Sequence, residues 1–210
     1  MAACSSASFV AAFSFYYLLP AKRHLLLEED NVLETLSALT YLTVAAIAFI
    51  NARPHQPARR ALWFVGAVAL VGFLDELSFG ERMFDLKMPV IRGKKIDAVH
   101  DLVSLGFRLT REFPAIALPL LALAGIAFLA VVWAQRPRLI AFVLTHHRHP
   151  ALRFFAVFVA MIFAALVIDL GLKNSDGLFL MEELFELNAG LALGFCAWSL
   201  RAANASSKTP

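Results

Sequence analysis

The sequence predicts an all-α fold, a polytopic membrane helix bundle of about six transmembrane helices with an interfacial segment between the third and the fourth. Composition is the first reason, because 60% of the residues are hydrophobic and 17% are charged, against about 25% charged in a soluble domain. The second reason is that long stretches contain no Asp, Glu, Lys or Arg. A helix needs about 20 apolar residues to cross about 30 Å of hydrocarbon. We expect a single transmembrane domain over residues 1–200 and a disordered tail over residues 201–210.

The uncharged stretches predict where each span lies. Stretches 1–21, 35–52 and 113–135 are long enough by themselves, whereas 61–74, 154–168 and 187–200 need some of their charged flanks. The first stretch has neither the basic start nor the cleavage site of a signal peptide, so it is read as a span. Residues 81–112 mix Met, Phe, Leu and Val with basic residues, as interfacial segments do. The expected spans are residues 2–20, 31–52, 61–79, 113–135, 152–172 and 179–200.

Charges separate between the two sides of the expected bundle. Six spans put both termini on one side, face A, with the loops 53–60 and 136–150; the other side is face B. Face A has only basic residues, while all 16 carboxylates fall on face B. Short loops rich in Lys and Arg stay cytoplasmic, so we expect a bacterial inner-membrane protein with both termini cytoplasmic. The basic residues of face A are Arg53, Arg59, Arg60, Arg136, Arg138, Arg148, Arg153, Arg201 and Lys208.

Several carboxylates of face B lie where charge is costly. The third and fifth spans end on face B, so Asp75, Glu76 and Asp169 sit near helix C-termini, where negative charge is disfavoured. The uncharged residues 61–74 cover roughly 21 Å, which leaves Asp75 and Glu76 within the hydrocarbon depth. The same length argument, applied to the sixth span, places Glu183 and Glu186 within the membrane. Intramembrane charges cost about 2.5–3.5 kcal/mol and usually face a partner or a cavity. We therefore predict a polar cavity open to face B.

A structural explanation competes for other acidic residues. Glu112 and Glu182 fall in first helical turns, where the macrodipole favours negative charge. The remaining acids could be neutralised by Arg82, Arg108 and Arg111, which lie on the same face. This ion network would suit a non-enzymatic accessory or assembly subunit.

A bound divalent cation is the leading alternative. Carboxylates with one imidazole suit Mn²⁺, Fe²⁺ or Zn²⁺, and an all-oxygen set suits Ca²⁺ or Mg²⁺. Asp97 and His100 share one helix face in "DAVHD". Such a metal would polarise an oxygen or activate water for lipid-directed hydrolysis or transfer. A proton-coupled transporter is a further alternative. The predicted ligands are Glu34, Asp75, Glu76, Asp97, His100, Glu183 and Glu186.

Partners are constrained by the same patterns. Basic residues are spread over loops, which argues against nucleic acid and leaves membrane lipids as the expected partner. Gly190 and Gly194 form a G-x-x-x-G pair, which permits close helix packing within the chain or a homo- or hetero-oligomer. Cys4 and Cys196 both fall in spans, so a disulfide framework is not expected.

Two resemblances follow from longer motifs. "LDELSFGERMF", then "DAVHDL" and "MEELFEL", resemble a group of uncharacterised bacterial multi-pass membrane proteins with an E-E-x-S-x-G-Q-R-like box. That resemblance implies a shared site without naming an activity. "LLEEDN" with "FLDEL" is similar to alkaline ceramidases, which implies calcium ligands at Glu29 and Asn31 and a catalytic-site aspartate at Asp75. The S-x-x-x-H and H-x-x-x-H motifs that hold zinc in that family are missing.

Overall fold

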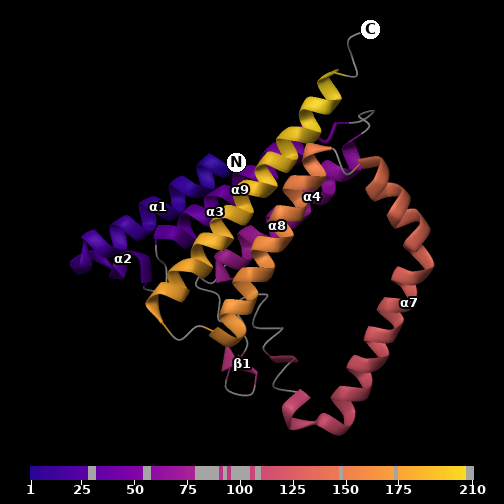
Figure 1. The fold of residues 1–210 in the computed structure, drawn as a ribbon, viewed down its shortest axis with the longest axis horizontal. Helices are drawn as coiled ribbons and strands as arrows, with labels where there is room; N and C mark the ends of the chain where they lie inside the picture. Colours follow the sequence, from indigo (N-terminus) through magenta and orange to yellow (C-terminus); the bar gives the residue numbers. More distant parts are fainter. Residues whose placement is uncertain are drawn as a thin grey trace. The chain divides into compact units, whose positions relative to one another are not determined.

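The computed structural model describes residues 1–27, 32–53, 58–78, 90–91, 94–95, 105–106, 110–146, 149–172 and 175–206 (Figure 1). These residues are almost all helical, which confirms the all-α class. The short strands β1 (Val90–Ile91) and β2 (Lys94–Lys95) pair antiparallel, with Val90 opposite Lys95. Contacts divide the chain into a first unit, residues 1–86 and 150–210, and a second unit, residues 87–149. The single domain expected over residues 1–200 stays a prediction.

The described residues of the first unit form five long helices, one for each expected span in that unit. They are α1 (Ala2–Leu18), α3 (Val32–Asn51), α4 (Arg59–Glu76), α8 (Pro150–Val167) and α9 (Asp176–Ser206). Shorter pieces join them: η1 (Pro20–Lys22), α2 (His24–Leu27) and η3 (Ile168–Leu172).

In the second unit the main element is α7 (Pro114–His146). This helix continues well past residue 135, where the fourth span was expected to end, so most of the expected loop 136–150 is helical. Pro119 and Pro137 lie inside it. The helix α9 likewise runs to Ser206, so the part of the expected disordered tail that the structure describes is helical. Alanines there favour helix, because Ala has the best intrinsic propensity.

Three helical stretches among the described residues are long and apolar enough to cross a membrane: Val32–Asn51, Pro114–Pro137 and Pro150–Leu170. The helix α1 is apolar but shorter, at 17 residues. These findings confirm helices able to span a membrane. The number of six spans belongs to the proposals below.

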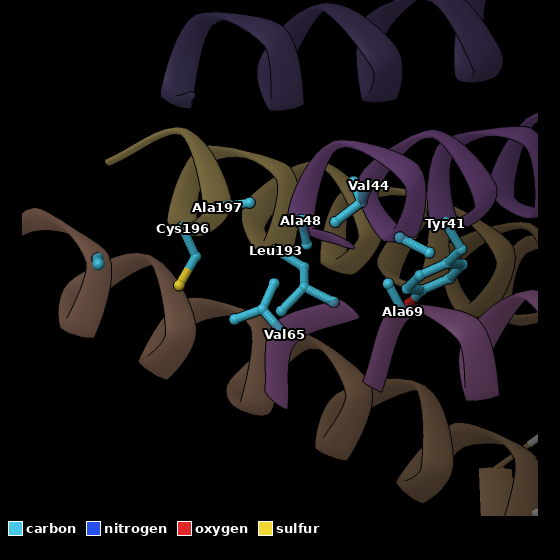
Figure 2. Close-up of a cluster of buried hydrophobic side chains, with 10 residues drawn as sticks. Tyr41, Val44, Ala48, Val65, Ala69, Leu193, Cys196 and Ala197 are labelled. Carbon is cyan, nitrogen blue, oxygen red and sulfur yellow. The ribbon is translucent and has the colours of Figure 1, made fainter. Parts of the chain in front are cut away.

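Small residues let α3 pack tightly between α4 and α9. A Cβ atom added at Gly72 would lie 2.9 Å from Tyr41 Cδ1, and one added at Gly66 would lie 2.6 Å from Phe49 Cε1. These two approaches show that α3 and α4 run antiparallel. The core between the helices contains Leu193 and Val65, which face each other in Figure 2.

Packing of α9 on α3 uses the predicted G-x-x-x-G pair. A Cβ atom added at Gly190 would lie 3.1 Å from Thr40 Cγ2, and one at Gly194 would lie 3.1 Å from Val44 Cγ2. The two helices therefore run parallel, and this glycine face packs within the chain. An oligomer through Gly190 and Gly194 stays a prediction.

A polar contact ties α1 to α9. Asn188 is fully buried, and its Nδ2 donates to Ser8 Oγ at 2.9 Å and to the Leu184 carbonyl at 2.7 Å. Apolar side chains from α1, α2, α3 and α9 complete this second core, among them Ala12, Leu26, Leu33 and Leu180. Cys4 and Cys196 are both free thiols.

Candidate functional site

The end of α4 supplies the first pair of acidic side chains. Asp75 and Glu76 are the last residues of the helix, and both are half-buried. The chain leaves the helix through Ser78, whose φ of 49° is the left-handed conformation that commonly terminates helices. The helix therefore ends directly after its two carboxylates, and places both at one end of the bundle.

The N-terminal half of α9 supplies the second group. Glu182 and Glu183 are buried, with exposed fractions of 6% and 5%, and Glu186 is half-buried. Glu183 and Glu186 are three residues apart and so share one face of α9. Burial of several charged side chains on one helix of a small bundle is unusual, because a buried charge needs a partner to offset its lost hydration.

The two groups lie within electrostatic range of one another. The charge of Glu76 interacts with those of Glu186, Glu183 and Asp75. Four predicted site residues, two from α4 and two from α9, are therefore linked electrostatically through Glu76, and we call them the carboxylate cluster. Its members are Asp75, Glu76, Glu183 and Glu186.

Tyr41 of α3 is the side chain that joins the two helices of the cluster. It is 2% exposed, and its hydroxyl donates to the backbone carbonyl of Glu186 at 3.3 Å. The charges of Glu76, Glu186 and Asp75 also act on this hydroxyl. Sequence reasoning missed Tyr41, because a tyrosine in an apolar stretch resembles any other core aromatic residue until its helix is packed.

Ser37 is a second polar residue that the sequence did not single out. It lies one turn before Tyr41 on α3, is fully buried, and its Oγ has no hydrogen-bond partner. By contrast, Thr40 on the same helix donates to the Leu36 carbonyl at 2.7 Å. Extending the antiparallel pairing of Tyr41 with Gly72 by one turn places Ser37 at the level of Glu76.

Of the other predicted site residues, two lie among the described residues and the rest do not. Glu34 lies in the first turn of α3 and is half-buried, one turn before Ser37. Arg111 is exposed in the second unit. The remaining predictions lie outside the described residues: Asp97, His100, Arg82 and Arg108, with Glu29 and Asn31 of the ceramidase-like motif.

A preformed metal site is not present in the part of the chain that the structure describes. Among those residues no group of three or more His, Cys, Asp or Glu side chains has an arrangement that could hold a metal ion. The cluster nevertheless concentrates negative charge in a partly dehydrated place, where like charges repel more strongly than in water. Such a cluster can bind a cation, hold protons, or pair with basic side chains.

Asp169 lies apart from the cluster in sequence, on the π-helical segment η3 that follows α8. It is half-buried. Short π-helical turns are rare in proteins, and those that occur often lie at functional sites. The structure thus gives Asp169 an unusual backbone setting, which the sequence pattern did not predict.

The fold and the cluster together define a class: an all-helical bundle with membrane-length helices and an acidic group at one end. Comparisons of the chain with protein-family models, curated proteins and solved structures give no match. The resemblances to the bacterial multi-pass group and to the alkaline ceramidases therefore stay predictions.

Proposed function

We propose that this chain is an integral membrane protein whose carboxylate cluster binds a divalent cation on the external side. One observation carries the proposal: Glu76 of α4 lies within electrostatic range of Asp75 and of Glu183 and Glu186 from α9, although about half of the chain separates the two helices' carboxylates. Carboxylates gathered from two helices in a partly dehydrated place repel one another, and a bound cation would offset that repulsion.

The cluster suits a cation that keeps part of its water shell. Mg²⁺ holds several waters and binds through one or two carboxylates, so it requires no group of three protein ligands. Asp97 and His100 would convert the site to one for Mn²⁺, Fe²⁺ or Zn²⁺ if they join it. Glu34 and the hydroxyl of Ser37 are further oxygen ligands on α3.

A bound cation would give the site its chemistry. A divalent ion lowers the pKa of a bound water or polarises an ester or amide oxygen. In a bundle of six spans with residues 81–112 at the interface, lipid is the substrate that reaches the cluster most readily. Lipid-directed hydrolysis or transfer is therefore the activity that we propose, in a bacterial inner membrane with both termini cytoplasmic. A ceramidase-like hydrolase is one form of it.

A structural ion network is the second candidate. It is supported by the lack of a three-ligand group among the described side chains. In that case Arg82, Arg108 and Arg111 would neutralise the acids, and the protein would be an accessory or assembly subunit. A proton-coupled transporter is the weakest alternative, because face A carries no carboxylate to continue a path across the membrane.

The first experiment is the metal content of detergent-purified protein, measured by inductively coupled plasma mass spectrometry. A Glu76→Gln, His100→Ala double variant should lose a near-stoichiometric metal that the wild type retains. Asp176→Asn is the matched control, since this exposed carboxylate at the start of α9 lies outside the cluster. A wild type without metal, even after reconstitution with divalent cations, would reject the cation site and favour the ion network.

A further inference from the structure

Four helix ends lie at one level at the opposite end of the first unit. Ala151 in the first turn of α8 shares a core with Ala48 of α3, Val65 of α4 and Ala197 of α9. Ring contacts agree, with Phe154 and Phe195 centroids 5.4 Å apart. In Figure 1 the start of α8 lies beside the last part of α9. Side chains at these four helix ends therefore belong to one surface.

That surface is rich in exposed arginine. Arg53 follows α3, Arg59 and Arg60 begin α4, Arg153 is in the first turn of α8, and Arg201 is in the last part of α9. All five are exposed.

Acidic side chains are remote from these arginines along every helix. The first carboxylate after Arg60 is Asp75, roughly 22 Å further along α4, and Glu186 precedes Arg201 by a similar distance on α9. Since the Debye length is about 8 Å at physiological ionic strength, the cluster cannot neutralise this surface. The exposed side chains of Arg59, Arg60 and Arg201 therefore present positive charge that suits an external anion.

Exposed tryptophans lie next to the arginines. Trp63 and Trp198 are 51% and 60% exposed, and the Arg201 guanidinium carbon lies 5.2 Å from the Trp198 ring centroid. Arg60 and Trp63 are three residues apart and share one face of α4. Tryptophan concentrates at membrane–water interfaces, and Arg binds phosphate through two parallel hydrogen bonds. The pairing fits the boundary between lipid headgroups and acyl chains.

The second unit also has an arginine next to an exposed tryptophan. Trp133 of α7 is 68% exposed, and the Arg136 guanidinium carbon lies 4.0 Å from the Trp133 ring centroid. All three tryptophans of the chain thus lie within four residues of an arginine on the predicted face A.

We propose that the arginine–tryptophan belt of the first unit binds the phosphates of anionic phospholipids in the leaflet next to face A. The belt comprises Arg53, Arg59, Arg60, Arg153, Arg201, Trp63 and Trp198. A water-soluble polyanion fits less well, because the apolar surface continues from the belt along α4 through exposed Phe64, Leu70 and Val71. Acyl chains cover such a stripe, and headgroup phosphates meet the arginines above it.

Lipid selectivity tests the proposal. The full-length protein is reconstituted in vesicles of mixed phosphatidylglycerol and phosphatidylcholine, and spin-labelled lipids report the relative association of each headgroup. The wild type should prefer phosphatidylglycerol several-fold. An Arg60→Gln, Arg201→Gln variant should lose most of that preference, whereas a Lys22→Gln, Lys95→Gln control, which removes the same charge from face B, should keep it.

Two further conditions make the result decisive. A chelator is present throughout, so that divalent ions bound at the carboxylate cluster cannot bridge to lipid phosphate, and the outcome is independent of the proposed cation site. Raising the salt concentration should weaken the wild-type preference, which tests the arginines even if the double variant fails to fold. Equal association of both lipids with the wild type, or an unchanged preference in the folded double variant, would overturn the proposal.

Discussion

The hydroxyl of Tyr41 donates to the backbone carbonyl of Glu186 at 3.3 Å, which links the middle of α3 to the face of α9 that carries the carboxylates. The ring lies beside Gly190 of α9, where an added Cβ atom would be 3.5 Å from Tyr41 Cζ, an ordinary van der Waals distance. On its other side the ring packs against Gly72 of α4. One aromatic side chain thus spaces the two helices that provide the cluster.

Removing the hydroxyl should weaken this link while the ring stays in place. We expect Tyr41→Phe to lower the free energy of unfolding by about 0.5–1.5 kcal/mol, the usual net value of one hydrogen bond. Thermal unfolding in detergent measures the change. Tyr17→Phe is the control, because Tyr17 is 68% exposed. Equal stability of Tyr41→Phe and wild type would mean that packing alone positions the ring.

Filling the space beside Tyr41 should be more damaging. A Cβ atom at Gly72 would lie 2.9 Å from Tyr41 Cδ1, so Gly72→Ala forces the ring or α4 to move. We expect a loss of about 1–3 kcal/mol, as for other overpacked cores. Gly125→Ala on α7 meets no atom within 4 Å and should be neutral or stabilising, because Ala favours helix over Gly. A stabilised Gly72→Ala would contradict the α3–α4 packing.

The glycine pair of α9 gives a prediction about assembly. If Gly190 serves packing on α3, Gly190→Leu should destabilise the folded chain, since even a Cβ atom would lie 3.1 Å from Thr40 Cγ2. Light scattering of the detergent complex would then give the same oligomeric mass as the wild type wherever the variant folds. A fully folded variant of reduced oligomeric mass would instead favour the intermolecular role.

Polar packing between α1 and α9 is testable at Asn188. Truncation by Asn188→Ala removes the donor to Ser8 Oγ and leaves a cavity at a fully buried position. The expected loss is about 1–3 kcal/mol, from the lost hydrogen bond and the cavity, since Ser8 Oγ keeps its hydrogen bond to the Ser5 carbonyl at 2.8 Å. Protease sensitivity of α1 should rise in parallel. Unchanged proteolysis and stability would show that α1 is held by its apolar contacts alone.

The sequence predicted the helices well for a physical reason. Apolar stretches with few charges also form helix readily, so each expected range contains one. Helix ends were predicted less well, because each expected span was ended where the hydrocarbon core of the membrane would end. The backbone hydrogen bonds of a helix can continue beyond that core, and α7 and α9 continue to His146 and Ser206.

The approximate location of the acidic residues was predictable in the same way. The estimated depth in the membrane singled out Asp75, Glu76, Glu183 and Glu186, and the other three lie within electrostatic range of Glu76. Their role as a functional site stays a prediction. Tyr41 could not be found, since its role depends on its packing against Gly72 of α4 and on its hydrogen bond to the Glu186 carbonyl of α9. Ser37 has no sequence signal either, because a buried serine without a partner is recognised only when its surroundings are known.

Glu76→Gln separates the cation site from the ion network by the sign of its effect. With a chelator present, removing one charge should relieve repulsion among the cluster carboxylates, so we expect the variant to unfold at a higher temperature than the wild type. Adding a divalent cation should then stabilise the wild type by RT ln(1 + [L]/Kd), about 2.7 kcal/mol at a hundredfold excess over Kd, and should hardly change the variant. In an ion network the charge of Glu76 is needed by an arginine, and its removal should destabilise the protein with or without cation. Asp176→Asn, which removes an exposed charge outside the cluster, should show neither the chelator effect nor the loss of cation response.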